Sequence, residues 1–221
     1  MAPFHPRLAE LPEEIGIFPL PGALLLPQGK LPLNIFEPRY LAMTLDALAN
    51  GRMFGMIQPD LRLPRTDGGP GLYRIGCLGR LSSFSETDDG RLLITLTGLA
   101  RFRILEERPL DESGYRSARV DYTEFSRDLV LDGNAPVLDR AALLGALRPY
   151  FRARGIEANW DAIEQMPDAT LVTTLAMVCP FDVPEKQALL EAADPTERAQ
   201  ILVALMHMGA AANAPAEGRP S

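Results

Sequence analysis

Prolines and glycines interrupt an apolar stretch near the start of the chain at intervals that few folds accommodate. The stretch begins Phe18-Pro19-Leu20-Pro21-Gly22, continues through Leu24-Leu25-Leu26-Pro27, and ends Pro32-Leu33-Asn34-Ile35-Phe36-Glu37-Pro38-Arg39-Tyr40. Proline cannot donate a backbone hydrogen bond to a sheet ladder, so these prolines must lie at strand starts, sheet edges or turns. The apolar pieces between them are therefore predicted to be short strands that bend sharply, as at the corners of a small barrel.

Further strands are predicted downstream, with one helix between them. Pro38 opens this helix, because its fixed backbone angle suits the first helical turn. Asp89-Gly90 is a strong hairpin signal, and Gly98 is predicted to make the next turn. The predicted strands are residues 53–58, 74–84, 91–97, 102–105 and 115–125. Short strands around a single helix predict an antiparallel, barrel-like domain.

The pattern changes to helical periodicity after Asp128. Apolar residues recur there at intervals of three and four, which is typical of amphipathic helices. Two helix starts carry capping-box signatures, each an aspartate followed three residues later by a glutamate, at Asp182 and at Asp194. We therefore predict four parts, which are a flexible N-terminal arm, a β-barrel subdomain, a helical-bundle subdomain and a disordered tail. Their predicted ranges are residues 1–12, 13–128, 129–208 and 209–221.

The proline-rich opening segment resembles the start of the Lon substrate-binding domain, the N-terminal domain of the ATP-dependent Lon proteases. Further matches follow in the family's order, at Tyr73-Arg74-Ile75-Gly76-Cys77-Leu78-Gly79-Arg80-Leu81, at residues 90–102, at residues 185–191 and at Pro195-Thr196-Glu197-Arg198. The resemblance implies an α+β fold, a PUA-like antiparallel β pseudo-barrel with one inserted helix, followed by a C-terminal α-helical bundle. It also implies a stand-alone member of the family, without the ATPase and protease domains.

Charge, hydropathy and cysteine count indicate in which cellular compartment the protein works and which kinds of partner it binds. The formal net charge of −7 disfavours nucleic acid as a partner, because binding to phosphates rests largely on Lys and Arg. No apolar run reaches the roughly 20 residues of a membrane span, and residues 1–7 do not resemble a signal peptide. Cys77 and Cys179 are too few for a disulfide framework. We expect a cytoplasmic protein with two buried free thiols.

The sequence offers no recognisable catalytic, cofactor or metal site. The glycines and lysine of residues 22–30 have the wrong spacing for a phosphate loop, and Leu31 replaces the required Ser or Thr. The histidines, His5 and His207, lie near the two ends and form no zinc-binding pair. Lys186 is expected to be a solvated surface residue. We therefore expect a protein that is not an enzyme, with no cofactor and no metal.

The remaining expectation is a non-catalytic protein-binding module, since the Lon domain helps to recognise unfolded or tagged segments. An edge strand could accept a peptide by strand addition, or an apolar groove could hold side chains. The candidate polypeptide contacts are Leu33, Phe36, Met53 and Met56, although core packing is expected for each individually. Glu37 and Arg39 are expected to fix the start of the helix, and Phe36 and Tyr40 to lie in the core.

Two other functions stay open, together with the oligomeric state. PUA-like barrels often bind RNA, which here would need a basic stripe formed by Arg74, Arg80, Arg101 and Arg103. The chain could instead be an accessory subunit of an ATP-dependent proteolytic system. The expected partners are proteins or unfolded polypeptide segments, without nucleic acid or membrane, and a dimer is kept open.

Overall fold

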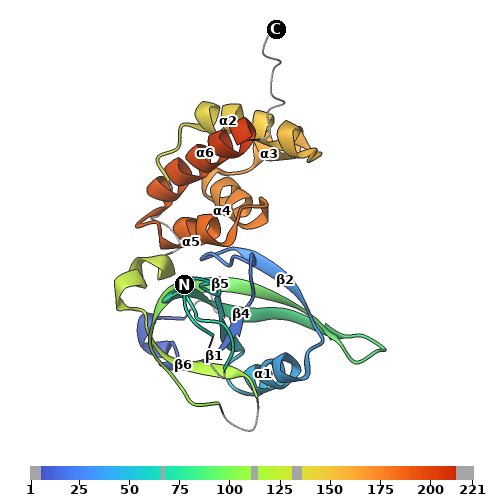
Figure 1. The fold of residues 1–221 in the computed structure, drawn as a ribbon, viewed down its shortest axis with the longest axis vertical. Helices are drawn as coiled ribbons and strands as arrows, with labels where there is room; N and C mark the ends of the chain where they lie inside the picture. Colours follow the sequence, from blue (N-terminus) through green and yellow to red (C-terminus); the bar gives the residue numbers. More distant parts are fainter. Residues whose placement is uncertain (1–5, 66–67, 111–113, 131–135, 213–221) are drawn as a thin grey trace.

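The computed structural model describes residues 6–65, 68–110, 114–130 and 136–212. A β-rich part comes first along the chain and a helical part second, and the two stack on each other (Figure 1). The strands are β1 (Glu14–Pro19), β2 (Lys30–Ile35), β3 (Met53–Ile57), β4 (Ile75–Glu86), β5 (Leu92–Glu107) and β6 (Arg116–Asp121). The α-helices are α1 (Pro38–Ala49), α2 (Arg140–Arg154), α3 (Trp160–Gln165), α4 (Asp168–Val178), α5 (Val183–Glu191) and α6 (Pro195–Ala212).

The sheet is curled into a pseudo-barrel rather than a closed barrel. Its strand order is β2-β5-β4-β3-β1-β6, and β6 also pairs with the far half of β5. The predicted antiparallel arrangement holds for every pairing except that of β1 with β3, which is parallel. Parallel neighbours need a crossover connection, and here β2 and α1 supply it. The predicted fold class, a pseudo-barrel with one inserted helix and then a helical bundle, is confirmed.

Two local predictions in the β-rich part are wrong. The triplet Leu24-Leu25-Leu26 is not a strand but a buried loop, since Gly22 has a φ of 74° and prolines flank the triplet. Gly98 does not end a strand, because β5 runs through it with a register shift against β4. A Cβ at Gly98 would lie 2.0 Å from the Leu26 carbonyl oxygen, so glycine allows the buried loop to cross β5 closely.

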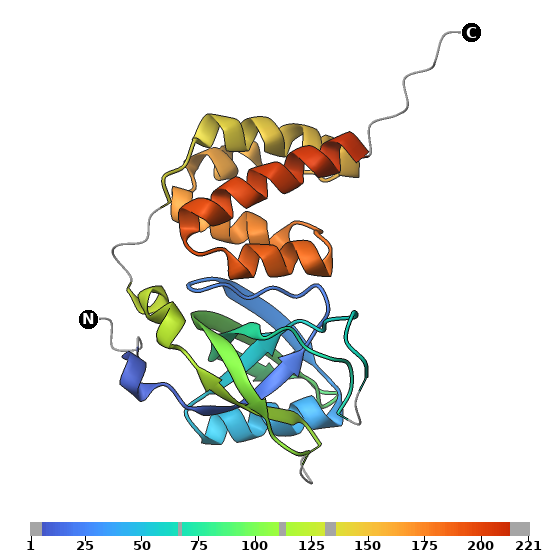
Figure 2. The same ribbon diagram turned by 60° about the vertical axis from the view of Figure 1, so that its left-hand side comes forward.

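The helical part begins its helices at the predicted caps. Asp182 and Glu185 form the predicted capping box at α5, where the Asp182 amide donates to Glu185 Oε2 at 2.8 Å. Asp194 caps α6 by accepting from the backbone amides of Thr196 and Glu197. Helix α5 lies between the sheet and the rest of the bundle, and α1 covers the opposite end of the pseudo-barrel (Figure 2).

One hydrophobic core connects the β-rich and helical parts. Phe18, Leu25 and Phe54 belong to the same buried cluster as Tyr150 and Leu202. A second cluster, which includes Ile17 and Phe102, fills the interior of the pseudo-barrel. The two parts therefore share buried apolar surface, which is the main source of folding free energy.

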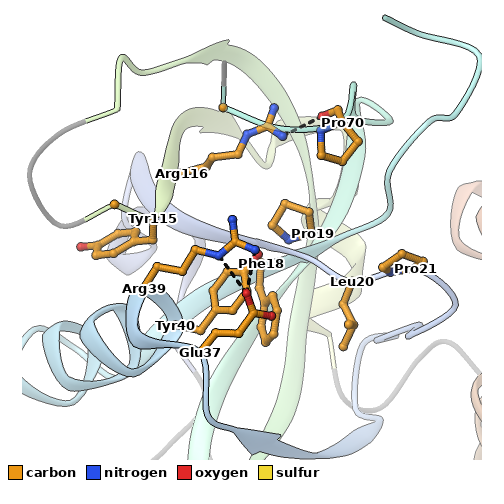
Figure 3. A pocket seen from close by; sticks show the side chains of 12 residues that line it. Phe18, Pro19, Leu20, Pro21, Glu37, Arg39, Tyr40, Pro70, Tyr115 and Arg116 are labelled. Carbon is orange, nitrogen blue, oxygen red and sulfur yellow. Dashed lines mark hydrogen bonds and ion pairs between the residues drawn. The ribbon is translucent and has the colours of Figure 1, made fainter. Parts of the chain in front are cut away.

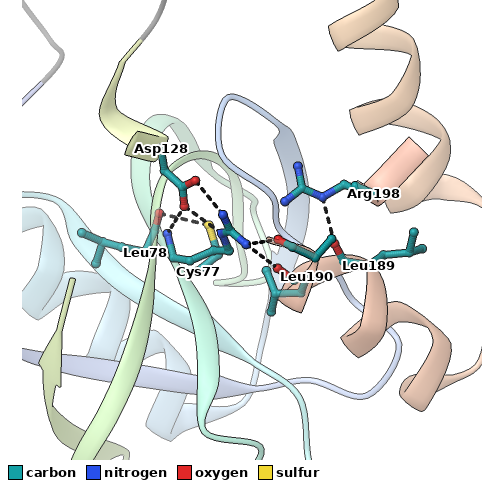
Figure 4. Close-up of polar contacts among 8 residues, drawn as sticks. Cys77, Leu78, Asp128, Leu189, Leu190 and Arg198 are labelled. Carbon is teal, nitrogen blue, oxygen red and sulfur yellow. Dashed lines mark hydrogen bonds and ion pairs between the residues drawn. The ribbon is translucent and has the colours of Figure 1, made fainter. Parts of the chain in front are cut away.

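A buried ion pair ties the sheet to the helices (Figure 4). Arg101 of β5 is 4% exposed, and its Nε and Nη2 donate to the Asp128 carboxylate, each at 2.9 Å. Its Nη1 donates to the backbone carbonyl of Leu190, in the last turn of α5, and to that of Ala192, directly after the helix. Arg198 of α6 lies beside this pair, with its Nε bonded to the Leu189 carbonyl at 2.8 Å. The end of α5 is thus held between two buried guanidinium groups.

Lys186 is a second polar link, and the prediction that it is a solvated surface residue is wrong. It is 6% exposed, and its Nζ donates to the backbone carbonyls of Gly22 at 2.7 Å and Met177 at 3.0 Å. The side chain of Gln58 links the same two segments. Its Oε1 accepts from the backbone N–H of Gly22, and its Nε2 donates to the Val183 carbonyl. The loop after β1 is therefore fixed to α4 and α5.

The described ends of the chain are more ordered than the sequence indicates. Leu8–Glu10 form a single 3-10 turn, and Leu11 is buried against the pseudo-barrel. Residues 1–5 of the predicted arm and residues 213–221 of the predicted tail lie outside the described residues. Helix α6 continues through Gly209 to Ala212, because Gly209 packs closely on the Tyr150 ring and alanine favours the helix.

Candidate functional site

The proline-rich segment forms one wall of a pocket at the side of the pseudo-barrel (Figure 3). We call it the motif pocket, and its volume is about 250 Å³. The residues that line it come from β1 and the following turn, from the start of α1, and from the two loops that precede β4 and β6. They are Phe18, Pro19, Leu20, Pro21, Glu37, Arg39, Tyr40, Gly68, Pro70, Gly114, Tyr115 and Arg116. Two segments of the motif, separated by β2, thus meet at one cavity.

An ion pair between Glu37 and Arg39 lies at the rim of the pocket. Arg39 donates from Nε and Nη2 to Glu37 Oε2 at 3.2 and 2.8 Å. The two side chains therefore form a salt bridge, but the Glu37 side chain makes no capping bond to the helix. The helix start depends instead on Pro38 and on the Glu37 carbonyl, which accepts from the amides of Tyr40 and Leu41.

Aromatic rings and a second arginine complete the pocket. Tyr40 is buried, as predicted, and its ring centroid lies 4.0 Å from that of Phe18. The Arg39 guanidinium lies over the Tyr40 ring, 4.6 Å from its centroid. Arg116 is also buried, forms an ion pair with Glu107, and donates from Nη1 to the Pro70 carbonyl at 2.7 Å. Tyr115 at the rim donates to Asp46 Oδ2 at 2.9 Å.

A second surface surrounds the hairpin that joins β4 to β5, which projects from the body of the pseudo-barrel (Figure 1). Three large apolar side chains are exposed there, namely Phe36 at 60%, Phe84 at 52% and Leu93 at 45%. Together with the half-buried Leu33 of β2 they form what we call the hairpin surface. An open groove of about 610 Å³ runs along it. Contiguous exposed apolar side chains mark interaction sites more often than scattered ones do.

Strand pairing brings these residues together. Leu33 of β2 and Phe84 of β4 both face Ile94 of β5, so the three share one face of the sheet. Leu93 points to the other face at the same level of the hairpin. The Arg91 guanidinium lies 5.9 Å from the centroid of the Phe36 ring and holds that ring beside the edge of the sheet.

Comparison with known proteins assigns the family. The family model described as the ATP-dependent protease La (LON) substrate-binding domain matches residues 14–208. The chain belongs to the Lon substrate-binding domain family. The matched model is the substrate-binding domain and not the ATPase or protease domain of Lon, so the family assignment supports a role in substrate binding.

Individual relatives agree with this assignment. Lon protease 2 of Myxococcus xanthus is 27% identical over 202 residues, which cover 90% of this chain and 24% of that protein. The Lon protease of Dictyoglomus thermophilum is 27% identical over 195 residues, which cover 86% of this chain and 24% of that protein. The chain thus spans about a quarter of the length of these Lon proteases.

Solved structures of Lon N-terminal domains share the fold. The crystal structure of a Lon N-terminal domain protein from Xanthomonas campestris has a TM-score of 0.60 and 24% identity, and the match covers 86% of this chain and 97% of that chain. The N-terminal domain of the Mycobacterium avium complex Lon protease has a TM-score of 0.57 and 16% identity, over 87% of this chain and 97% of that one.

The four candidate polypeptide contacts of this Lon-family chain do not form one patch. Leu33 and Phe36 lie on the hairpin surface, and the expectation that Phe36 is a core residue is wrong. Met56 is buried, and Met53 lies half-buried opposite Arg80, further along β4 from the hairpin. Sequence reasoning missed Phe84 and Leu93. The consecutive apolar residues 92–94 in a two-faced strand were the available signal, because one of them must point to the outer face.

The basic stripe that RNA binding would require is not formed. Arg101 is buried against Asp128, and Arg103 forms an ion pair with Glu124 at 2.7 Å. The other two arginines of the expected set, Arg74 and Arg80, lie on β4 or directly before it. This arrangement does not support the RNA-binding alternative.

The two thiols behave as the sequence indicates. Cys77 and Cys179 are both buried and not joined in a disulfide. Burial raises the pKa of the Cys77 thiol well above its usual range and that of Cys179 to about 12. Neither thiol has the low pKa of a nucleophile. Within the described parts of the chain, no cluster of three or more His, Cys, Asp or Glu side chains could hold a metal ion.

The longest described helix, α6, has 18 residues. Among the residues that the structure describes, no helix is both long and apolar enough to cross a bilayer.

Proposed function

We propose that this chain is a non-catalytic protein-binding module that engages exposed apolar or extended polypeptide segments at its hairpin surface. The observation that carries the proposal is that the exposed Phe84 and Leu93 line one groove of a substrate-binding domain, with the exposed Phe36 just after β2. Removing such side chains from water requires an apolar partner, and unfolded polypeptide supplies one without needing a fixed shape.

The groove is a better binding mode than addition of a strand. Strand β2 pairs with β5 alone, so its other edge is free among the described strands. The Gly98 amide donates to the Gly29 carbonyl, so Gly29 and Gly98 form a hydrogen-bonded pair. Because such pairs alternate along an antiparallel ladder, the backbone N–H and C=O groups of residues 30, 32 and 34 point away from β5, toward the free edge. Pro32 has no N–H, so the centre of the free edge lacks a donor. Side-chain contacts in the groove must therefore provide most of the affinity.

An NMR titration with casein, an unfolded polypeptide, tests the proposal. We expect saturable shift changes at the amides of residues 33–34, 83–85 and 93–95, which line the groove. Phe84→Ser should weaken binding about tenfold, since it removes much of one exposed aromatic contact of about 1.4 kcal/mol. Leu61→Ser is the matched control, because Leu61 is 81% exposed in the loop after β3, away from the groove.

Shift changes elsewhere with a silent groove, or equal effects of the two substitutions, would refute the hairpin surface as the binding site. Association with a separate ATP-dependent protease is a further proposal that follows from the family. It predicts that the purified chain does not degrade casein with ATP, but alters degradation when an ATP-dependent protease from the same cell is added. The subdomain ranges 13–128 and 129–208 and a dimeric state likewise stay proposals.

A further inference from the structure

The motif pocket presents hydrogen-bond donors that no described residue engages. The Nε and Nη2 of Arg39 bond to Glu37, and its Nη1 has no partner among the described residues. The Tyr40 hydroxyl likewise has no bonded partner in the described part of the chain, although it lines the pocket. Burial raises the pKa of the Tyr40 hydroxyl, and the charges of Arg39, Glu37 and Arg116 contribute smaller shifts. A ligand must therefore bring acceptors.

The pocket is nevertheless close to electrically neutral. Glu37 neutralises Arg39, and Glu107 neutralises the buried Arg116. An anion would have to compete with these carboxylates, and it would lose its own hydration on binding. Carbonyl oxygens are acceptors without a formal charge, so they satisfy the free donors at lower cost.

The opposite wall of the pocket is apolar. Pro19, Leu20 and Pro21 lie across from the arginine and tyrosine side chains in Figure 3, and the Phe18 ring packs beside Tyr40. The volume of about 250 Å³ is slightly below the roughly 300–1,000 Å³ of sites for drug-sized ligands. One side chain with its flanking peptide groups matches this size.

We propose that the motif pocket binds a single apolar side chain of an uncharged polypeptide segment, whose backbone carbonyl oxygens accept from Arg39 and Tyr40. The inference rests on the proposed polypeptide-binding function but concerns a different site from the hairpin surface. The chain would then hold one segment at two places, which raises its apparent affinity beyond that of either.

N-acetyl-L-phenylalanine methylamide is the probe, because it carries one apolar side chain between two uncharged amides. We expect saturable shifts at the amides of Gly22, Gly114, Tyr115 and Arg116, with a Kd on the order of 1 mM, as suits so small a ligand. N-acetyl-L-phenylalanine, which ends in a carboxylate, should bind no more tightly. Affinity for the methylamide should change less than about twofold when salt shortens the screening length from about 10 to about 3 Å.

Tyr40→Phe tests the hydroxyl and keeps the ring in the core. We expect affinity for the probe to fall about five- to tenfold, the equivalent of one hydrogen bond. Tyr122→Phe is the matched control, since its hydroxyl bonds to the Pro12 carbonyl away from the pocket, and it should leave affinity unchanged. Equal effects of both substitutions, silent pocket amides, or tighter and salt-dependent binding of the carboxylate would each overturn the inference.

The two proposals fail in different ways. If casein shifts the hairpin surface while the methylamide leaves the pocket silent, the inference about the pocket is wrong and the proposed function stands. If the methylamide binds in the pocket while casein binds nowhere, the proposed function is wrong. Phe84→Ser should weaken casein binding and leave the affinity for the methylamide unchanged.

Discussion

Neutralising Asp128 should destabilise this chain far more than neutralising any exposed carboxylate. Asp128 accepts from Arg101 Nε and Nη2 and from the Arg101 amide at 3.0 Å. Asp128→Asn keeps the shape of the side chain and one acceptor oxygen, but it removes the charge. The buried Arg101 then keeps the backbone carbonyls of Leu190 and Ala192 and one neutral side-chain oxygen as partners, but no counter-charge.

The magnitude follows from the surroundings of the pair. Two unit charges about 4 Å apart attract by about 4 kcal/mol at the effective dielectric constant of protein interiors, and breaking a buried pair costs about 3–5 kcal/mol. Burial, and the nearby Arg101 cation, lower the pKa of Arg198 to about 10, so a second buried cation also depends on Asp128. Because asparagine keeps one acceptor, we expect a loss of about 3 kcal/mol, or about 6–12 °C in Tm.

Urea unfolding followed by circular dichroism measures this change, with Glu124→Gln as the matched control. Glu124 is paired with Arg103, two residues along β5 from Arg101, but both side chains are about half exposed, and such pairs contribute at most about 1 kcal/mol. The double variant Arg101→Met/Asp128→Leu should recover part of the loss, because it removes the buried pair but leaves Arg198 without Asp128. A loss below about 1 kcal/mol for Asp128→Asn, or equal losses for both single variants, would refute the reasoning.

Three further predictions concern single residues. Burial lowers the pKa of Lys186, so the unfolded chain binds that proton more tightly than the folded chain does. Wild type should therefore gain unfolding free energy relative to Lys186→Met as the pH rises toward the usual lysine pKa of about 10.4, measured by denaturant titration. Gly98→Ala should cost about 1–3 kcal/mol in the same assay, because its Cβ meets the Leu26 carbonyl, and an unchanged midpoint would contradict the close crossing. Cys77 and Cys179 should react with a thiol reagent only after denaturant is added, and rapid labelling of the native protein would contradict their burial.

The parts of the fold that the sequence predicted correctly depend on local chemistry. Helices begin at the predicted positions, marked by Pro38 and by the capping residues Asp182 and Asp194. The backbone angle of proline and the amides that the caps bond all lie within four residues of the helix start. The strand predicted at residues 115–125 is present as β6, over Arg116–Asp121, because alternating buried and exposed side chains suit a half-buried strand. Pro32 correctly indicates an edge strand, since a central strand would need its missing donor.

The errors share a cause, which is that the deciding partner lies far along the chain. Arg101 and Lys186 are charged residues that a sequence pattern assigns to the surface. They are buried because carbonyls at the end of α5 and in the turn after β1 satisfy their donors. Gly98 resembles a turn residue, but its function is to let the Leu26 loop cross β5. In each case the two partners are too far apart along the chain for a short sequence pattern to include both.

The candidate sites divide in the same way. The residues of the hairpin surface could be partly predicted, because Leu33 and Phe36 lie in an unusual proline-rich segment. Phe84 joins them only through pairing of β4 with β5. The motif pocket could not be predicted, since its lining combines residues near 20, 40, 70 and 115.

By itself, the sequence determined the kind of protein, because prolines, glycines and caps restrict the backbone wherever they occur. It therefore specified a pseudo-barrel followed by helices and the resemblance to the Lon substrate-binding domain. Only the tertiary structure decided which charges are buried, which apolar side chains stay exposed, and where the proline-rich segment becomes the wall of a pocket. Those outcomes depend on contacts between distant segments, which form when the chain closes on itself.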